Sequence, residues 1–177
     1  EPLLDYVNVT TGTSASLGGA IHIVPPMAYQ NGYLASSARR YKEVLGKPVF
    51  VAGRINQPQD AESLLQGGAA DVIGMTRALI CDPDMPAKAQ QGRLDDIRAC
   101  IACNQACIGR FHRGYPISCL QRPETGRELQ YGRIEPAARK KRVMVVGGGP
   151  AGATAAHDLA REGLSVLLLD RAGRVVE

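Results

Sequence analysis

The 177 residues are 45% hydrophobic and 21% charged, which is typical of a soluble globular protein of one or two domains. No apolar run is long enough to cross a bilayer, so the composition excludes a helical membrane protein. The net charge of +4 includes the basic run at 139–142, which lacks interleaved aromatic residues and fits a solvated linker better than a nucleic-acid site.

The first half of the sequence alternates predicted strands and helices. In chain order we expect a strand at 5–10, a helix at 34–45, a strand at 47–53, a helix at 57–66, a strand at 70–75 and a short helix at 83–91. A long Gly/Pro-rich loop at 11–27 follows the first strand, and loops of that length tend to be functional. This alternation with tight Gly-rich joints predicts an α/β fold with parallel strands and right-handed crossovers.

Glycine and arginine recur where two successive strands are predicted to end. Gly53 and Arg54 follow the second strand, and Gly74, Met75 and Arg77 follow the third. A parallel α/β unit is either an open sheet or part of a (β/α)8 barrel, and in barrels the chemistry lies at these strand ends. Glycine lets backbone amides approach an oxyanion, and arginine binds phosphate through two N–H groups. Each arginine alone could be a surface ion-pair residue, but their repetition favours a phosphate site, with FMN as its natural ligand.

Four of the five cysteines fall within twenty residues, at Cys100, Cys103, Cys107 and Cys119, with the spacing C-x2-C-x3-C-x11-C. Such density indicates a disulfide framework, a zinc site or an iron–sulfur site. Zinc usually takes paired C-x2-C knuckles or histidine partners, whereas three close thiolates and a fourth after a loop suit a [4Fe-4S] cubane. We therefore favour the cluster, with zinc and free thiols as alternatives. Cys81 lies outside the spacing and is better explained as a small buried hydrophobic residue.

The last forty residues or so begin with a predicted strand at 142–146 and continue into a glycine-rich turn. Gly147, Gly149 and Gly152 form a G-x-G-x-x-G pattern that opens a predicted helix at 151–162, and a second strand at 164–169 follows. This strand–turn–helix–strand order is the context of a dinucleotide-binding fingerprint, although a βαβ unit that has lost its ligand is an alternative.

Each position of the fingerprint has a physical role. Gly147 permits the tight turn, Gly149 lets a pyrophosphate reach the helix amino terminus formed by Pro150 and Ala151, and Gly152 allows close helix–strand packing. Asp170 closes the second strand 23 positions after Gly147 and is expected to accept a hydrogen bond from a ribose hydroxyl.

A barrel end, the segment Cys-Ile-Ala-Cys-Asn-Gln-Ala-Cys at 100–107 and a Gly-Gly-Gly-Pro-Ala-Gly turn follow one another in this chain. This combination resembles the flavin iron–sulfur oxidoreductases related to old yellow enzyme, among them trimethylamine, dimethylamine and histamine dehydrogenases, 2,4-dienoyl-CoA reductase and N-methylproline demethylases. The resemblance covers the whole chain. It implies FMN in the barrel, one [4Fe-4S] cluster, and FAD or ADP, with NAD(P)H in some members, in the domains that follow.

The resemblance also assigns residues by position. It makes Cys100, Cys103, Cys107 and Cys119 the cluster ligands, Gly53, Arg54, Gly74, Met75 and Arg77 the FMN phosphate contacts, Gln105 a residue near the flavin, and Gly147, Gly149, Pro150, Ala151, Gly152 and Asp170 the adenine-dinucleotide site. Many relatives carry glutamate where this chain has the shorter Asp170.

Three parts are then expected. Residues 1–95 form the carboxyl-terminal strands and helices of an FMN-binding TIM barrel, 96–135 the [4Fe-4S] segment and linker, and 136–177 the start of an FAD- or NAD(P)-binding Rossmann-like domain. A complete barrel takes about 250 residues, so we interpret the chain as an internal segment of a longer enzyme whose catalytic residues lie upstream. A cytoplasmic location, a small-molecule substrate and the remainder of the polypeptide as partner are expected, and self-association is left open.

The implied function is an oxidoreductase in which the cluster relays electrons between FMN and a second dinucleotide site. An N-methylated amine is the expected substrate, so that the enzyme is a dehydrogenase or demethylase. An NAD(P)H-dependent 2-enoate or 2,4-dienoyl-CoA reductase is the alternative within the same class. A zinc-stabilised nucleotide-binding interaction module is the alternative from another class.

Overall fold

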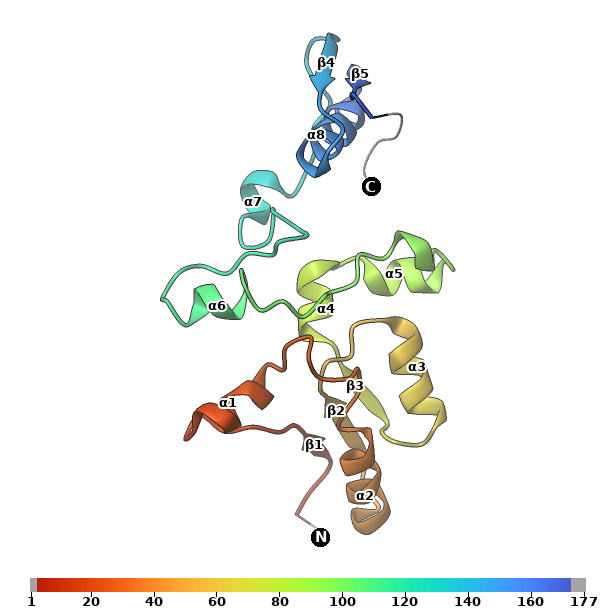
Figure 1. Cartoon of the computed structure of the whole chain (residues 1–177). Coiled ribbons are helices and arrows are strands. Elements are labelled where there is room, and N and C mark those ends of the chain that lie inside the picture. The colour runs from red at the N-terminus through yellow and green to blue at the C-terminus, as the bar shows by residue number, and fades with distance from the viewer. Residues whose placement is uncertain (1–2, 173–177) are drawn as a thin grey trace. The chain divides into compact units, whose positions relative to one another are not determined.

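The computed structural model describes residues 3–172, and the chain divides into two compact units, Glu1–Gly126 and Arg127–Glu177 (Figure 1). The first unit holds the predicted barrel strands together with the cysteine segment, and the second holds the glycine-rich turn. The finer division expected from the sequence, with boundaries near 95 and 135, stays a prediction.

The first unit is built on a three-stranded parallel sheet in the order β1-β2-β3. The strands are β1 (Val7–Val9), β2 (Val49–Ala52) and β3 (Val72–Gly74). Val7 pairs with Val49, and Phe50 pairs with Val72, both in parallel register. The expectation of parallel strands joined by helices is thereby confirmed for this unit. All three strand ends consequently lie at the same edge of the sheet.

Helix α2 (Ala35–Leu45) packs on β1 and β2, and helix α3 (Pro58–Gln66) follows β2. Side chains alternate in burial along β2, because successive residues of a strand point to opposite faces. Val49 and Val51 are fully buried, and each stabilises the fold by about 1.5–3 kcal/mol relative to exposure. The buried residues of this core are Val9, Leu34, Ala38, Val49, Val51, Ile55 and Ala70.

Short helices occupy much of the remaining first unit and the start of the second. They are α1 (Leu17–Ile23), α4 (Thr76–Cys81), α5 (Met85–Gln90), α6 (Ile108–Phe111) and α7 (Glu128–Tyr131), with a 3₁₀ turn η1 (Leu94–Asp96). The interpretation of 11–27 as a loop was wrong where α1 forms. Ser16 caps that helix by accepting a hydrogen bond from the Gly19 amide at 3.0 Å, and the low helix propensity of Gly18 and Gly19 concealed it.

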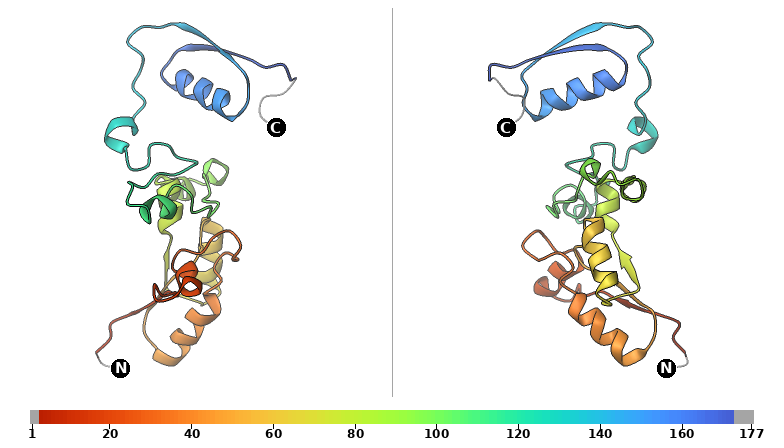
Figure 2. Two further views of the ribbon diagram at one scale, coloured as in Figure 1. Left: turned by 60° about the vertical axis from the view of Figure 1, so that its left-hand side comes forward. Right: turned by 90° about the vertical axis from the view of Figure 1, so that its right-hand side faces the viewer.

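The second unit contains β4 (Arg142–Val146), α8 (Pro150–Arg161) and β5 (Ser165–Leu169). The two strands are parallel, with Arg142 opposite Ser165 and Val146 opposite Leu169. Both views in Figure 2 show α8 lying along one face of this strand pair, and the helix contacts both strands. The predicted strand–helix–strand unit is confirmed. No helix within residues 3–172 is long and apolar enough to cross a membrane.

Candidate functional site

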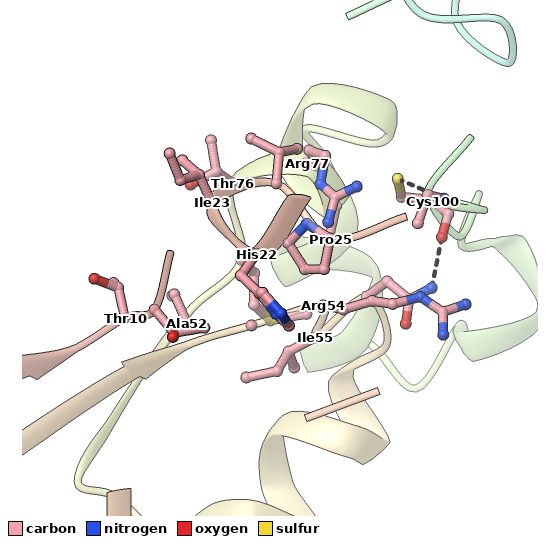
Figure 3. A pocket seen from close by; sticks show the side chains of 18 residues that line it. Thr10, His22, Ile23, Pro25, Ala52, Arg54, Ile55, Thr76, Arg77 and Cys100 are labelled. Carbon is pink, nitrogen blue, oxygen red and sulfur yellow. Dashed lines mark hydrogen bonds between the residues drawn. The ribbon is translucent and has the colours of Figure 1, made fainter. Parts of the chain in front are cut away.

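A cavity of about 240 Å³ opens where the carboxyl ends of β1, β2 and β3 meet (Figure 3). Its walls come mainly from residues that directly follow each strand, completed by the end of α1 and by the cysteine segment. The lining residues are Thr10, Thr11, His22, Ile23, Val24, Pro25, Ala52, Gly53, Arg54, Ile55, Asn56, Gly74, Met75, Thr76, Arg77, Ala78, Cys100 and Ala102. All five residues expected to contact an FMN phosphate therefore line this one cavity, which we call the strand-end cavity.

Arg54 has two features that are typical of a ligand-binding residue. Its backbone is left-handed, with φ of 49°, which is uncommon for a residue with a side chain. Its Nε is buried and has no hydrogen-bond partner within residues 3–172. An unpaired buried N–H costs free energy, so the position favours an acceptor supplied by a bound molecule. Figure 3 shows Arg54, Arg77 and Cys100 together on one side of the cavity and Thr10 and Ala52 on the other.

Packing also favours glycine at the two strand ends. A Cβ on Gly53 would lie 3.1 Å from the Leu34 side chain, and a Cβ on Gly74 would lie 3.0 Å from the Ala52 Cβ. Both separations are tighter than ordinary side-chain contacts, so glycine lets the two strand ends pack closely against Leu34 and Ala52. The role of these residues as phosphate contacts stays a prediction.

The four cysteines predicted as ligands line a second, smaller cavity, which we call the four-cysteine cavity. Cys100, Cys103, Cys107 and Cys119 are all free thiols and all partly buried. Within residues 3–172, no three His, Cys, Asp or Glu side chains lie close enough to hold a single metal ion. Four thiols around one cavity are nevertheless the donor set that a [4Fe-4S] cluster uses, so the residue types present fit such a group.

The backbone of the cysteine segment is bent tightly by two left-handed residues, Ala102 with φ of 53° and Asn104 with φ of 58°. The Ala102 amide lies 3.4 Å from the Cys100 sulfur and donates to it. Farther along, the Ser118 amide donates to the Ala106 carbonyl at 2.8 Å, which brings the fourth cysteine back to the third. These local bonds explain how a spacing of eleven residues still places all four thiols around one cavity.

Cys81, a neighbour of the Cys119 and Cys100 thiols, is 1% exposed, as expected of a small buried hydrophobic residue. Burial, together with the neighbouring Cys119 and Cys100 thiols, raises the pKa of Cys81 to about 12. Burial also raises the pKa of Cys100, although the Ala102 amide and the Arg77 charge act in the opposite direction. The positive charge of Arg77 therefore acts on Cys100, the first of the predicted cluster ligands.

The two cavities share a wall made of Arg77, Cys100 and Ala102. Asn56, which follows β2, donates from its side-chain amide to the Cys100 carbonyl. The Met27 amide, in the segment after α1, donates to the Ala102 carbonyl at 3.1 Å. The cysteine segment is thus hydrogen-bonded to the loops that form the cavity at the strand ends.

Asn104 makes the most direct connection across this wall, and the sequence did not point to it. The Arg77 Nη1 donates to the Asn104 Oδ1 at 2.7 Å, and the Asn104 Nδ2 donates to the Val24 carbonyl at 2.8 Å. Asparagine tolerates left-handed backbone better than most residues, which is the one signal in the motif that could have singled it out. Gln105, the predicted flavin neighbour, is exposed and lines neither cavity, and its role stays a prediction.

In the second unit the glycine-rich turn has the geometry that a dinucleotide site needs. Gly147 has φ of 104°, and a Cβ on Gly152 would lie 1.8 Å from the Gly147 carbonyl oxygen, so neither position accepts a side chain in this backbone. Gly149 caps the amino terminus of α8, and Pro150 begins that helix, followed by Ala151. A Cβ on Gly149 would meet no described atom within 4 Å, which leaves open space where a pyrophosphate would approach.

Asp170 closes the turn against the end of β5. Its carboxylate accepts hydrogen bonds from the Gly148 amide and from the Ala172 amide, the latter at 2.7 Å. These bonds, that of Gly148 first, lower the pKa of Asp170. The side chain lies next to the turn, where a ribose contact was predicted, but in this structure it also holds the turn in place.

Comparison with known proteins identifies two matching families. Residues 8–96 match the NADH:flavin oxidoreductase / NADH oxidase family, and residues 145–175 match an NAD(P)-binding Rossmann-like domain. The three strands and the first cavity fall within the first match, apart from the first residue of β1 and the two cavity residues of the cysteine segment, while the glycine-rich turn falls within the second.

Individual relatives cover nearly the whole chain. An NADH oxidase from Thermoanaerobacter brockii is 40% identical over 84% of the chain and 23% of the relative, and a dimethylamine dehydrogenase from Hyphomicrobium sp. is 36% identical over 96% and 23%. The structure of a 2-naphthoyl-CoA reductase complex superposes with a TM-score of 0.86 at 33% identity, over 98% of this chain and 26% of that one. The chain thus spans about a quarter of the length of the proteins it matches.

Proposed function

Because the chain belongs to the NADH:flavin oxidoreductase / NADH oxidase family, we propose that it is the segment of a longer oxidoreductase that joins an FMN site to an iron–sulfur site. The observation that carries this proposal is the shared wall: Arg77, Cys100 and Ala102 line both the strand-end cavity and the four-cysteine cavity. Two redox groups held on opposite sides of one layer of side chains can exchange electrons.

The strand-end cavity is the proposed FMN site. β1, β2 and β3 would be the last three strands of a (β/α)8 barrel, in which a phosphate site commonly forms from the loops after the last two strands. The unpaired Nε of Arg54 would donate to a phosphate oxygen, and Arg77 would add a second positive charge. When bound, FMN supplies reversible two-electron chemistry.

The four-cysteine cavity is the proposed site of a [4Fe-4S] cluster. Cys100, Cys103, Cys107 and Cys119 would be the ligands, and the cluster would supply one-electron steps between two-electron partners. The protein's own contribution is the environment of the sulfurs. The Ala102 amide donates to Cys100, and hydrogen bonds to sulfur and nearby charge set a cluster's reduction potential.

The turn at Gly147–Gly152 is the proposed second dinucleotide site, which would take FAD or ADP, with NAD(P)H as electron donor or acceptor elsewhere in the full protein. The open space at Gly149 and the start of α8 would receive the pyrophosphate. Asp170 would offer a carboxylate oxygen to a ribose hydroxyl at the cost of sharing it with the Gly148 amide.

For the substrate we propose an N-methylated amine, oxidised by dehydrogenation or demethylation. A relative named dimethylamine dehydrogenase supports this, whereas the relatives named cinnamate reductase and 2-naphthoyl-CoA reductase support reduction of an enoate or a CoA ester. Anaerobic mixing of the full-length protein with dimethylamine or with NADH and cinnamate distinguishes the two. Bleaching of the flavin by the amine alone favours the first, and NADH-dependent consumption of cinnamate favours the second.

The experiment that tests the cofactor proposal is an anaerobic visible spectrum of the full-length protein, with iron, zinc and acid-labile sulfide assayed on the same sample. We expect flavin bands above a broad shoulder and about four iron and four sulfide per chain. A colourless protein with one zinc and no sulfide would contradict the proposal and would indicate a zinc-stabilised nucleotide-binding module instead.

A further inference from the structure

Asn104 lies between the second and third cysteines, yet both of its side-chain bonds leave the cysteine segment. Its Oδ1 accepts from Arg77 at 2.7 Å, 27 residues earlier in the sequence, and its Nδ2 donates to the Val24 carbonyl at 2.8 Å, 80 residues earlier. Asn104 does not line the strand-end cavity itself, whereas both of its partners do. Asn104 can therefore act on a ligand in that cavity through Arg77, the charged one of its two partners.

Arg77 lies between the two cavities, and a hydrogen-bond partner is needed to fix the direction of its side chain. Its side chain lines both cavities, so its guanidinium can face either the predicted phosphate or the cysteines. The hydrogen bond from Nη1 to Asn104 holds one end of the Arg77 guanidinium and so limits the rotamers that this long side chain can adopt. The remaining N–H groups are then presented from a fixed direction.

The backbone at Asn104 explains why this residue type is suited to the task. With φ of 58°, the position favours asparagine or glycine over other residues. Its carbonyl accepts from the Gly109 amide at 2.8 Å, which holds the turn independently of the side chain. Of the two residue types that the backbone favours, only asparagine also supplies an acceptor for Arg77 and a donor for Val24.

We propose that Asn104 is a positioning residue of the FMN site, which holds Arg77 in the orientation that binds the phosphate group. The inference rests on the proposed function, since it takes FMN as the occupant of the strand-end cavity. It links the two sites physically, because the turn that carries the cysteines also sets the position of a phosphate-binding arginine.

The test compares FMN with riboflavin, which has the same ring system and no phosphate. Flavin-free full-length protein is titrated with each, and binding is followed by quenching of flavin fluorescence. Asn104→Gly removes the side chain and keeps the left-handed backbone unstrained. We expect it to weaken FMN binding about tenfold, the loss typical of a hydrogen bond to a charged group, and to leave riboflavin affinity and iron content within twofold of wild type.

Two further variants make the result specific. Arg77→Gln should weaken FMN binding at least as much, and adding Asn104→Gly to it should cause no further loss, because the second residue acts through the first. Gln66→Ala deletes a comparable amide bond, the exposed 2.8 Å contact with Glu62, at a residue that lines neither cavity, and should change neither affinity.

The outcomes separate this inference from the function on which it rests. If wild type binds neither flavin, the proposed FMN site is wrong. If wild type prefers FMN and Arg77→Gln abolishes that preference, but Asn104→Gly matches wild type, only the role of Asn104 is wrong. Equal loss of FMN and riboflavin in Asn104→Gly, accompanied by loss of iron, would likewise overturn the positioning role in favour of a purely structural one.

Discussion

The side-chain amide of Gln121 donates to the carbonyl of Ala99 at 2.7 Å and so joins the residue before the first predicted ligand to a residue just beyond the last. The same Nε2 lies 3.4 Å from the buried Cys81 sulfur. The two ends of the cysteine segment are thereby held together, next to the buried Cys81. This bond adds to the one from the Ser118 amide to the Ala106 carbonyl, which brings the fourth cysteine back to the third.

Removing this bond should loosen the proposed cluster without removing a ligand. In the Gln121→Ala variant we expect full iron content on purification but faster loss of iron to a chelator, by about three- to tenfold, because the partly buried Ala99 carbonyl loses its donor at a cost of about 1 kcal/mol. The absorbance of the iron–chelator complex gives the rate. Gln66→Ala deletes the exposed 2.8 Å bond to Glu62 and is the matched control. Equal rates for both variants and wild type would rule out the closure.

Arg77 should also influence the cluster electrically. Its positive charge lies close enough to Cys100 to oppose the rise in pKa that burial causes at that thiol. Positive charge near a cluster stabilises the reduced form, so Arg77→Gln should lower the reduction potential, by up to about 59 mV, the one-electron equivalent of a tenfold change in equilibrium constant. An anaerobic redox titration followed by electron paramagnetic resonance measures the shift.

The control for this charge effect is Arg39→Gln, which removes an exposed arginine that donates to the Gly67 carbonyl on the outer surface of the same unit. Its cluster potential should equal that of wild type. An unchanged potential in Arg77→Gln would mean that the guanidinium is screened from the sulfurs and acts only on the first cavity.

Asp82 anchors the approach to the cysteines and should confer acid sensitivity. It is 4% exposed, and its carboxylate accepts from Lys88 at 2.6 Å and from the Arg98 amide at 2.9 Å. Burial alone would raise the pKa of Asp82, but the hydrogen bonds from Lys88 and Arg98 outweigh it, and the pKa is lowered from the usual 3.8.

Because the folded-state pKa of Asp82 is depressed, its stabilising contribution is fully present above about pH 4 and is lost as the pH falls through the lower folded value. Asp82→Asn should remove that contribution at every pH, because the partly buried Lys88 then loses its anion, at a cost of about 2 kcal/mol. Thermal denaturation at pH 7 and in the acid range checks both statements. Asp95→Asn, at an exposed position of η1, should melt like wild type across the same range.

The sequence predicted those helices and strands that depend on local patterns. The β-branched strands, the glycine stops after α2 and the strand–turn–helix of the second unit follow from short-range periodicity and turn chemistry. The five strand-end residues could be gathered at one site in advance because parallel strands end at one edge of a sheet. Helix α1 was missed because its cap, Ser16, precedes two glycines that argue against a helix.

The contacts that join the two cavities could not be predicted in the same way. Arg77 and Asn104 are 27 positions apart, and their bond exists only because the turn after Cys103 is placed against the end of β3. Within the motif, Asn104 and Gln105 are chemically similar, and only the three-dimensional placement shows that the first is engaged and the second exposed. Pairings between distant segments are set by tertiary structure, which local patterns do not encode.

The glycine-rich turn offers a test that separates folding from ligand binding. In Gly149→Ala the new methyl group meets no described atom within 4 Å, so the turn should fold normally, yet the methyl group would occupy the space proposed for the pyrophosphate. In Gly152→Ala the new Cβ would lie 1.8 Å from the Gly147 carbonyl oxygen, which forces the turn and α8 apart. Both variants should retain about four iron per chain and wild-type FMN content, because every residue that lines the two cavities belongs to the other unit.

The Gly149→Ala and Gly152→Ala variants should differ in thermal stability, although both should lose the adenine nucleotide proposed to bind at the glycine-rich turn. We expect Gly149→Ala to melt within about 2 °C of wild type and Gly152→Ala to melt several degrees lower, in keeping with a steric cost of more than 1 kcal/mol. The adenine nucleotide released on denaturation, quantified by chromatography, should fall at least tenfold in each. Nucleotide retained at wild-type level in Gly149→Ala would mean that the ligand does not approach the amino terminus of α8, and the second dinucleotide site would have to be placed elsewhere.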